Sequence, residues 1–342
     1  MTRIALVGLG AMGRNHLRVL GELENVELAA VCDSDAAVVS PASRKYHVPG
    51  YISWVEMFER ERLEAAIVAV PTRFHLEVGL AALQRGIHVL IEKPIAAGVS
   101  EGQQLIEAAR RAGRVLAIGH IERFNPAVQE LQRHLEAGEI GRVFQIHARR
   151  QGPFPARIRD VGVVIDLATH DLDVMCQLVA SNLSRVFAET EQRIHTEHED
   201  LLNALLKFES GALGVLQVNW LTPTKIRELS VLGERGMFVA NYLTQELTFN
   251  RNANAEPHTA GRGNPKSVAE GEMVSYPIAK AEPLRLELES FLKSVRSGGR
   301  PTVDGEAGLR ALQMALALVA SAAEGRAIAG DELRGLLSPP QA

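Results

Sequence analysis

Short apolar runs alternate with amphipathic stretches over the first third of the chain. Residues 3–8, 26–33, 63–70, 87–94 and 114–120 have the length and apolar content of buried strands. Residues 14–23 and 101–113 between them have a helical period, and Ser40-Pro41 has the pattern of a helix start. This alternation predicts α/β architecture, with a doubly wound parallel sheet of the Rossmann type over residues 1–120.

The pattern changes after His120. Strands are expected at 142–150, 204–208, 212–220, 226–234 and 237–242, with a hairpin at Glu209-Ser210-Gly211. The polar stretch Arg251 to Gly271 is typical of an exposed loop, and helices are expected at 283–295 and 305–325. We expect residues 121–342 to form an α+β domain with a large, mostly antiparallel, open-faced sheet. Because such a face often becomes a subunit interface, we expect a homodimer or homotetramer.

Asp160 to Leu178 carries a polar stripe on an otherwise apolar stretch. At about 100° per residue, Asp166, His170, Asp173 and Gln177 share one helix face. The apolar surround predicts a mostly buried helix. Since unpaired buried charge is costly, the stripe must face either an internal hydrogen-bond network or a cavity.

Composition excludes several function classes. Hydrophobic residues make up 46% of the chain, and its formal net charge is −4. This composition lacks the excess of positive charge that indicates binding to nucleic acid or to a membrane surface. No apolar run reaches membrane-spanning length and the N-terminus enters a strand directly, so we expect a cytoplasmic protein. Cys32 and Cys176 lie in apolar runs, which suits reduced buried side chains, and no Cys/His spacing suggests a metal site.

A glycine-rich turn follows the first strand. The run from Gly8 through Gly10 to Gly13 fits G-x-G-x-x-G between a strand and a helix, where glycines allow close approach to a pyrophosphate. Asp33 follows 20 residues after Gly13, where a carboxylate binds ribose hydroxyls and repels a 2′-phosphate. Because no arginine occurs between Asp33 and Arg44, NAD is favoured over NADP. The adjacent Ser34 is included among the cofactor contacts.

Three features together resemble a known family: the glycine turn, Glu92-Lys93-Pro94 after a strand, and the spacing Asp166-x-x-x-His170. They are similar to the oxidoreductases named for glucose-fructose oxidoreductase, inositol dehydrogenase and MocA (Gfo/Idh/MocA). The resemblance implies a catalytic pair, Lys93 and His170, with Asp166 beside it. It also implies cofactor contacts from Gly10, Ala11, Met12, Asp33, Pro71, Thr72, His75, Glu92 and Lys93.

Segments starting at Gly119 and Arg149 resemble the UDP-N-acetylglucosamine 3-dehydrogenase branch of this family. That resemblance implies NAD-dependent oxidation of a sugar 3-hydroxyl to a ketone, which a pathway aminotransferase then converts to an amine. The run Asp160 to Val164 replaces a longer glycine-rich run of the family, which suits a nucleotide sugar better than a simple polyol.

The chemistry of alcohol oxidation fits these residues. It needs a base for the hydroxyl proton, a donor for the developing oxygen charge and an aligned nicotinamide. We expect His170 to be the base, Asp166 to orient it and Lys93 to hold the alcohol oxygen. A desolvated lysine can itself act as a base, so the opposite assignment stays open.

Four further residues are candidates for substrate binding. Arg157 and Arg159 could bind a diphosphate through their guanidinium groups, or could be solvated loop residues. Arg123 and Asn125 could contact either ligand.

Three alternative functions remain open at this stage. One is a dehydrogenase of the same family acting on a free sugar, an inositol or a uronic-acid nucleotide. Another is a glycosidase that retains its NAD and shows no net reduction. The third is a dinucleotide-sensing regulator, a reading disfavoured because this chain keeps both Lys93 and His170.

Overall fold

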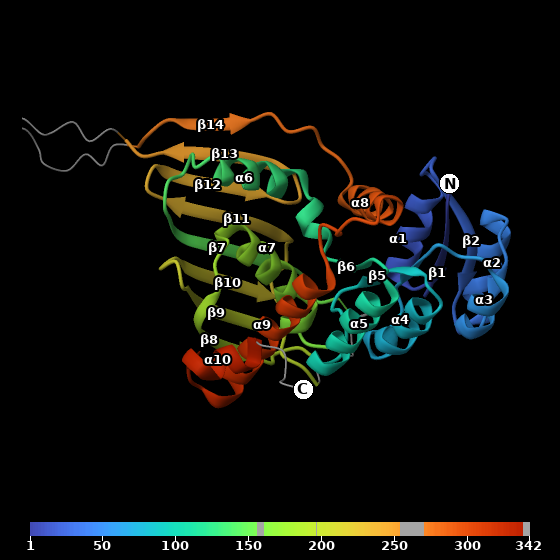
Figure 1. Cartoon of the computed structure of the whole chain (residues 1–342). Coiled ribbons are helices and arrows are strands. Elements are labelled where there is room, and N and C mark those ends of the chain that lie inside the picture. The colour runs from blue at the N-terminus through green and yellow to red at the C-terminus, as the bar shows by residue number, and fades with distance from the viewer. Residues whose placement is uncertain (156–160, 196, 254–269, 338–342) are drawn as a thin grey trace, which may run out of the picture. The chain divides into compact units, whose positions relative to one another are not determined.

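The computed structural model describes residues 1–155, 161–195, 197–253 and 270–337 (Figure 1). It divides into two compact units. The first contains residues 1–124, 282–316 and 334 onward, and the second contains residues 125–281 and 317–333. These units differ from the expected domains, 1–120 and 121–342, because the chain returns to the first unit at Glu282.

Helix α8 (Pro283–Ser297) explains this return. Its apolar residues Leu284, Leu288, Phe291 and Leu292 recur at helical spacing and are each at most 4% exposed. They pack in one core with Leu17 and Leu90 of the first unit. Burying such a side chain contributes about 1.5–3 kcal/mol, so α8 is part of this core although it is distant in sequence.

The first unit contains a six-stranded parallel sheet in the order β3-β2-β1-β4-β5-β6. This order confirms the doubly wound Rossmann-type sheet. The order reverses between β1 and β4, and ligands of such sheets bind beyond the carboxyl ends of the strands at this point. Its elements, besides α8, are β1 (Thr2–Val7), α1 (Ala11–Leu20), β2 (Val26–Cys32), α2 (Ala36–Tyr46), β3 (Gly50–Tyr51), α3 (Trp54–Arg60), β4 (Ala65–Val68), η1 (Thr72–Phe74), α4 (His75–Gln84), β5 (His88–Glu92), α5 (Val99–Ala112), β6 (Leu116–Gly119) and η2 (Ile121–Phe124).

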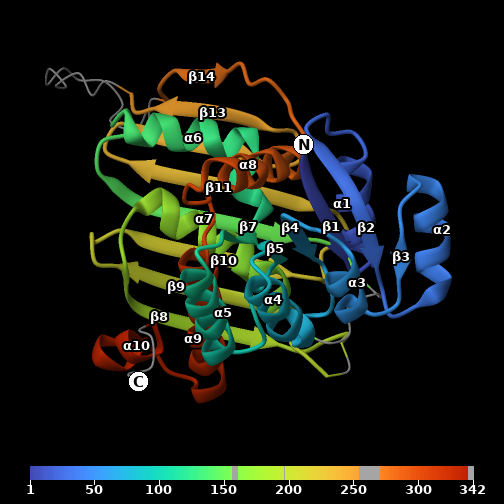
Figure 2. The same ribbon diagram turned by 45° about the vertical axis from the view of Figure 1, so that its right-hand side comes forward.

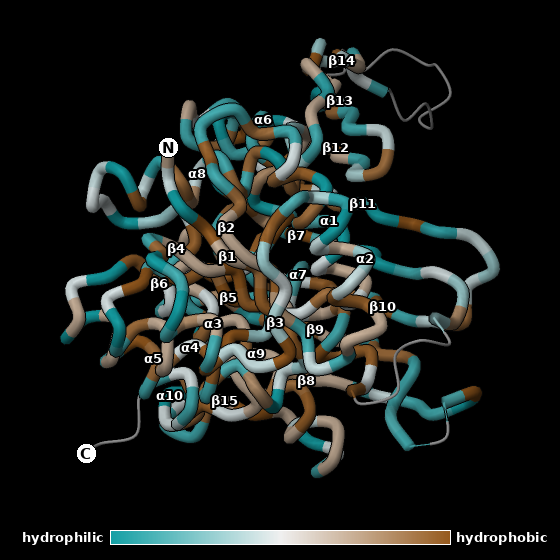
Figure 3. Tube along the Cα trace, turned by 90° about the vertical axis from the view of Figure 1, so that its right-hand side faces the viewer, coloured by the Kyte–Doolittle hydropathy of each residue, from teal (hydrophilic) through white to brown (hydrophobic). Residues whose placement is uncertain are grey.

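Helices cover both faces of this sheet. Residues of α1, α2 and α8 form one core with the strands, while α4 packs on α5, β4 and β5. The strands β1, β4 and β5 run through the apolar middle of the unit, as the brown segments of Figure 3 show. The strand ends are thereby held rigidly, which gives the loops beyond them defined positions.

The local pattern was misread at α2. This helix begins at Ala36 and Pro41 lies inside it, so the predicted start at Ser40-Pro41 was wrong. The Asp35 carboxylate accepts a hydrogen bond from the Ala37 N–H at 2.8 Å and caps the earlier start. The short elements β3 and α3 were also not predicted.

The second unit contains a nine-stranded sheet in the order β14-β13-β12-β11-β7-β10-β9-β8-β15. Figure 2 shows most of these strands side by side, from β14 to β8. Among the described strand pairs of this sheet, only β7–β10 is parallel, so the expected mostly antiparallel sheet is confirmed. Helix α9 (Gly305–Glu324) begins in the first unit and ends in the second. The other elements are α6 (Pro126–Glu136), β7 (Val143–Gln151), the π-turn η3 (Val164–Ala168), α7 (Thr169–Val179), β8 (Leu183–Glu191), β9 (Leu201–Phe208), β10 (Leu213–Asn219), β11 (Ile226–Gly233), β12 (Gly236–Asn241), β13 (Glu246–Arg251), β14 (Met273–Tyr276), β15 (Ile328–Ala329) and α10 (Gly330–Leu337).

Strand residues of this sheet alternate between a buried and a more exposed face. In β7, Ile146, Ala148 and Arg150 are buried, and the alternate positions are partly exposed. Helix α6 packs on β12 and β13, and α7 packs on β7. The most central part of the predicted loop from Arg251 to Gly271 lies outside the described residues. Within the described part of the chain, no helix combines the length and apolar character needed to span a membrane.

Candidate active site

The glycine turn has the geometry that a dinucleotide site requires. Gly8 has φ +98°, and a Cβ there would lie 2.4 Å from the Ala69 carbonyl oxygen. A Cβ on Gly13 would lie 1.9 Å from the Gly8 carbonyl oxygen, so only glycine lets α1 approach the turn. A Cβ on Gly10 meets nothing within 4 Å. Gly10 therefore faces open space, where a pyrophosphate could approach the backbone.

The N-terminus of α1 is suited to an anion. Gly10 is the N-cap residue and no side chain caps this helix. Exposed Ala11 and half-buried Met12 form its first turn. Uncapped N–H groups at a helix start bind phosphate oxygens.

Asp33 lies at the end of β2, beside the glycine turn. Its Oδ2 accepts a hydrogen bond from the Leu9 N–H at 2.7 Å, and its Oδ1 accepts one from the Asp35 N–H at 3.0 Å. These bonds orient the carboxylate, while the neighbouring Ser34 is exposed. The sequence prediction placed Asp33 correctly at this edge of the sheet, although the bond to Leu9 was not foreseen.

Glu92 ends β5 and is 8% exposed. Its Oε1 is 2.7 Å from Nε2 of His16, which projects from the buried face of α1. Burial acts to raise the pKa of Glu92, but the hydrogen bond and charge of His16, aided by Lys93 and His75, outweigh burial and lower it. Glu92 is therefore a buried carboxylate. His16 was not predicted as a site residue. It shares a helix face with the apolar residues Leu17 and Leu20, and this pattern could have indicated a buried imidazole.

Lys93 directly follows this carboxylate and is half-buried, and the Lys93-Pro94 peptide is cis. His75 lies beneath the same loop, with Nδ1 2.9 Å from the Pro94 carbonyl oxygen and Nε2 3.0 Å from that of Val70. Burial lowers the pKa of His75. Because a neutral imidazole carries one N–H, the ring donates to one of these two oxygens. His75 thus joins the loops that follow β4 and β5.

The Pro71-Thr72 turn begins the short helix η1. Pro71 is exposed and Thr72 is half-buried. It follows β4 at the strand-order reversal, so its position agrees with the expected cofactor loop.

In the second unit, the stretch carrying Asp166 and His170 starts with a π-turn. Both side chains are half-buried. The Thr169 hydroxyl donates to the carbonyl oxygen of Ile165, four residues earlier, at 2.9 Å. The assumption of 100° per residue was therefore wrong for Val164–Ala168. Asp166 and His170 lie on either side of this transition to the regular helix α7.

Glu199 caps the start of this stretch. Its Oε1 accepts a hydrogen bond from the Val164 N–H at 3.1 Å, and its carbonyl oxygen accepts one from Val163 at 2.9 Å. A Cβ on Gly162 would lie 2.0 Å from the Glu199 carboxylate, so a larger residue there would displace the side chain that caps this stretch. Sequence reasoning missed Glu199, because nothing in the local pattern links residues 162 and 199.

The rest of the polar stripe is structural. Gln177 donates to Gln132 of α6 at 2.6 Å, and Asp173 is 2% exposed. Asp171, which the stripe did not include, accepts two hydrogen bonds from buried Arg150. These contacts attach α7 to its neighbours.

The four candidate substrate residues are placed differently. Asn125 is 3% exposed; its Oδ1 accepts from the Ala127 N–H, and its Nδ2 donates to the Tyr242 carbonyl oxygen. Its side chain is thus the N-cap of α6 and is held by hydrogen bonds within the second unit. Arg123 is half-buried in η2. Arg157 and Arg159 lie outside the described residues.

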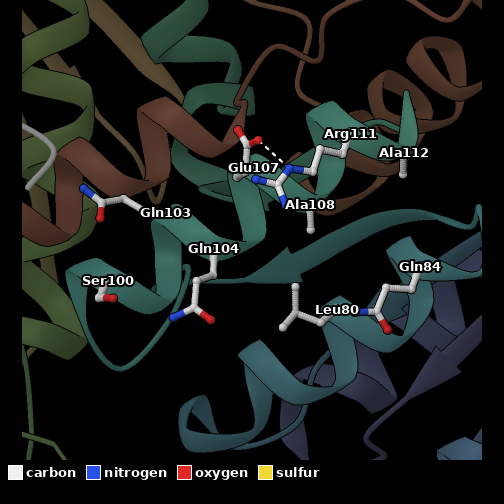
Figure 4. A pocket seen from close by; sticks show the side chains of 9 residues that line it. All are labelled: Leu80, Gln84, Ser100, Gln103, Gln104, Glu107, Ala108, Arg111 and Ala112. Carbon is white, nitrogen blue, oxygen red and sulfur yellow. Dashed lines mark hydrogen bonds and ion pairs between the residues drawn. The ribbon is translucent and has the colours of Figure 1, made fainter. Parts of the chain in front are cut away.

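A surface pocket of ≈ 720 Å³ between α4 and α5 is unrelated to these residues (Figure 4). It is lined by polar side chains including Gln84, Gln104 and the ion-paired Glu107 and Arg111. None of the expected cofactor or catalytic residues lines it. In the described ranges, no group of three or more His, Cys, Asp or Glu side chains is arranged to hold a metal ion.

Comparison with known proteins identifies both parts of this arrangement. Residues 2–120 match the model of the oxidoreductase family with an NAD-binding Rossmann fold, and residues 128–239 match the GFO/IDH/MocA C-terminal domain. The two matches together span about two thirds of the chain. The chain belongs to the Gfo/Idh/MocA oxidoreductase family.

Relatives within the Gfo/Idh/MocA family align almost end to end. UDP-N-acetylglucosamine 3-dehydrogenase of Acidithiobacillus ferrooxidans is 29% identical over 92% of this chain and 95% of its own length. Its crystal structure, GnnA, has a TM-score of 0.83 at 26% identity and covers 94% of this chain and 97% of that one. Myo-inositol 2-dehydrogenase of Thermotoga maritima is 26% identical over 97% of this chain and 100% of its own length.

A third relative was solved with ligands. The WlbA dehydrogenase of Chromobacterium violaceum, in complex with NADH and UDP-GlcNAcA, has a TM-score of 0.81 and 25% identity and covers 96% of both chains. This Gfo/Idh/MocA chain is accordingly an NAD-dependent dehydrogenase of a family whose members include sugar and polyol dehydrogenases. The glycine turn, the uncapped start of α1 and the oriented Asp33 carboxylate fit NAD.

Proposed function

We propose that the protein oxidises the 3-hydroxyl of a UDP-sugar, UDP-N-acetylglucosamine in the first place, to the 3-keto sugar with NAD. The end-to-end similarity to the Acidithiobacillus enzyme carries this choice. The ketone product would be consumed by an aminotransferase that installs a 3-amino group. A small-molecule substrate agrees with the formal net charge of −4, which favours neither nucleic acid nor an anionic membrane.

In this proposal the cofactor is bound by residues of the first unit. The glycine turn and first turn of α1 bind the pyrophosphate, and Asp33 with Ser34 binds the adenosine ribose. The Pro71-Thr72 turn and the Glu92-Lys93 pair contact the nicotinamide half. NAD supplies the hydride acceptor when bound.

The protein's own groups handle the proton and the oxygen. His170 removes the proton from the sugar 3-hydroxyl, because imidazole titrates near neutral pH. Asp166 orients the imidazole or stabilises its cation. Lys93 holds the alcohol oxygen as negative charge develops on it. Arg123, Arg157 and Arg159 remain proposed contacts for the substrate diphosphate.

A polyol substrate is the second candidate. The full-length similarity to the Thermotoga inositol dehydrogenase favours it. Its cofactor residues would be the same, so only substrate trials separate the two.

The deciding experiment incubates the protein with NAD and a panel containing UDP-N-acetylglucosamine, its uronic-acid analogue, myo-inositol and free sugars. Reduced nicotinamide is followed by absorbance and the keto product by mass spectrometry. An aminotransferase and an amino donor are included, because oxidation of an alcohol by NAD is often uphill. Turnover with inositol or free sugars and none with UDP-sugars would reject the main proposal. Release of free sugar without reduced cofactor would indicate a glycosidase. Binding of NAD without turnover of any substrate would indicate a regulator.

We also propose a homo-oligomer that uses the more exposed face of the nine-stranded sheet. Leu205, Leu213 and Leu232 project from this face and are 58%, 48% and 39% exposed. Strand pairing places Leu213 and Leu232 on either side of Gln145 of β7, and Leu205 opposite Val215, so the three leucines lie on the same face of the sheet. Light scattering at micromolar concentration should give a dimer or tetramer, and Leu205→Glu should lower the mass. A monomeric wild-type protein would contradict this.

A further inference from the structure

A pocket of ≈ 620 Å³ lies at the amino ends of two strands of the first unit. Its lining includes His88, where β5 begins, and Leu116, where β6 begins. Because all strands of this sheet are parallel, this edge is opposite to the one that carries Asp33 and Lys93. All of the described lining residues belong to the first unit, and none is an expected cofactor or catalytic residue. The pocket is therefore separate from the candidate active site.

Positive charge gathers in this pocket. Four arginines line it, two from the end of α5 and the turn after it, one from the loop after α8 and one from α9: Arg110, Arg114, Arg300 and Arg310. Asp304 and Glu306 are the carboxylates among the described lining residues. The lining thus has a formal charge of +2 with its histidine neutral, on a chain whose formal net charge is −4. Such a local excess of positive charge favours an anionic ligand.

Two of these guanidinium groups are already paired within the protein. Arg110 and Arg300 each form an ion pair with a nearby carboxylate. Arg114 and Arg310 are exposed, and in the ranges that the structure describes neither guanidinium forms an ion pair or a hydrogen bond. A guanidinium group presents its N–H donors in a fork that matches the oxygens of a phosphate. Two such groups in one pocket suit a ligand with about two negative charges.

His88 adds a neutral donor to the lining. Its Nδ1 accepts a hydrogen bond from the Val115 N–H at 2.9 Å, so the proton of the neutral ring is on Nε2. Burial, followed by the charge of Arg114, lowers the pKa of His88 and favours this neutral form. Nε2 has no hydrogen-bond partner among the described residues, so its N–H remains for a ligand.

The wall of the pocket is suited to an organic group. Gly113 and Gly298 have positive φ, +61° and +65°, and a Cβ on either would meet nothing within 4 Å. Apolar residues form another part of the wall: Ile106, Ala109, Val115, Leu116 and Pro301. Sites for small molecules combine such apolar walls with a few polar groups that fix the orientation, and this volume lies within their usual range.

We propose that this pocket is a second ligand site of the protein, which binds an organic phosphate monoester such as a sugar phosphate. Arg114 and Arg310 bind the phosphate group, whose charge is about −1.5 to −2 at pH 7. His88 donates a further hydrogen bond to it from Nε2, and the apolar wall contacts the organic group. The proposal does not depend on which sugar the active site oxidises.

The test uses the NAD-saturated protein, because NAD then fills the phosphate site at the glycine turn. Glucose 6-phosphate and uridine 5′-monophosphate are titrated into it by calorimetry at low ionic strength. We expect saturable binding, and the monoester that binds more tightly identifies the organic group. Arg114→Gln and Arg310→Gln should each weaken this binding about 10-fold or more, since each removes a charged hydrogen-bond donor. Glu306→Gln should tighten it, because it removes negative charge from the lining.

Arg296→Gln is the matched control, because Arg296 is an exposed arginine at the end of α8 that does not line the pocket. It should bind the monoester as wild type does. Since all the replaced side chains are exposed, each variant should fold with a melting temperature near the wild-type value. Bound monoester should raise the melting temperature of wild type and of Arg296→Gln more than that of Arg114→Gln or Arg310→Gln.

Three results would each overturn the proposal. The first is a lack of saturable binding of either monoester. The second is binding that Arg114→Gln and Arg310→Gln leave unchanged, or that Arg296→Gln weakens equally, because the anion would then bind elsewhere, for example at the substrate site. The third is equal affinity for succinate, a dicarboxylate of similar charge, which would reject a site selective for phosphate.

Discussion

Arg150 donates two hydrogen bonds to Asp171, from Nε at 2.6 Å and from Nη2 at 3.1 Å. Both side chains are at most 5% exposed, and the guanidinium also lies over the Tyr242 ring at 5.5 Å. The pair joins β7 to the first turn of α7, next to His170. It therefore holds the backbone from which the proposed base projects.

Removal of one partner of the Arg150–Asp171 pair should strongly destabilise the protein. Asp171→Ala leaves the Arg150 charge buried without its counter-ion, and we expect a loss of about 3–5 kcal/mol in the free energy of unfolding. Denaturant titration measures it. Glu228→Gln is the control, because it breaks the exposed ion pair between Arg149 of β7 and Glu228 of β11, whose charged atoms are 3.5 Å apart. This change should lower the free energy of unfolding by less than about 1 kcal/mol. Equal effects of the two changes would refute the special role of the buried pair.

The glycines of the turn should separate folding from cofactor binding. Gly13→Ala places a methyl group against the Gly8 carbonyl oxygen and should destabilise the protein by about 1–3 kcal/mol. Gly10→Ala meets no protein atom within 4 Å, so its stability should remain near wild type while NAD binding weakens. Thermal unfolding and calorimetric NAD titration give the two quantities. Undiminished NAD affinity in Gly10→Ala would remove that residue from the pyrophosphate site.

Asp33 should determine the choice between NAD and NADP. Asp33→Ser removes the carboxylate that would repel a 2′-phosphate, so the ratio of kcat/KM for NADP over NAD should rise by about 10- to 100-fold. Asp35→Asn is the control, because that side chain caps α2 and is exposed. An unchanged ratio in Asp33→Ser would show that the carboxylate serves only the turn at Leu9.

Lys93 and His170 can be assigned by paired replacements. His170→Asn should lower kcat by about 10²- to 10⁴-fold with NAD affinity retained, since the proton acceptor is lost. Lys93→Met should lower kcat and also weaken NAD binding. Near-native turnover in His170→Asn together with none in Lys93→Met would reverse the two roles.

Asp200 should make the stability of the folded protein decrease at acidic pH. Burial acts to raise the pKa of this carboxylate, but hydrogen bonds from the Ile194, His195 and Arg193 N–H groups outweigh burial and lower it. Its stabilisation is thus complete above the unfolded pKa of about 4 and is lost as pH falls through the lower folded value. The melting-temperature difference between wild type and Asp200→Asn should be largest at neutral pH and shrink below about pH 4. Glu189→Gln, an exposed change on β8, should show no such trend.

The cofactor half was predictable from sequence because its signals are local. A strand, the glycine turn and a helix occur in order, and Asp33 directly follows the next strand at the expected distance. The doubly wound parallel sheet followed from the alternation of short apolar runs with helical stretches. The start of α2 was misread because Pro41 is tolerated inside that helix, whereas the Asp35 cap sets its first residue.

The supporting contacts could not be predicted, since they join distant parts of the chain. His16 and Glu92 are 76 positions apart, and Glu199 reaches Val164 over 35 positions. The return of α8 to the first unit depends on tertiary packing of Leu288 and Phe291. The π-turn was also missed, because a regular helical period had been assumed through Asp166.

The Glu199 cap restricts how the second unit can recognise anions. The start of α1 is open, whereas the first donors of the stretch before α7 already face a carboxylate from the protein itself. A phosphate approaching there would meet like charge. Backbone capture of phosphate is thus available to the dinucleotide at α1. Under the proposed function, a substrate diphosphate would be recognised by cationic side chains instead. In that proposal substrate selection would vary through single arginine replacements, while dinucleotide binding would depend on the main chain.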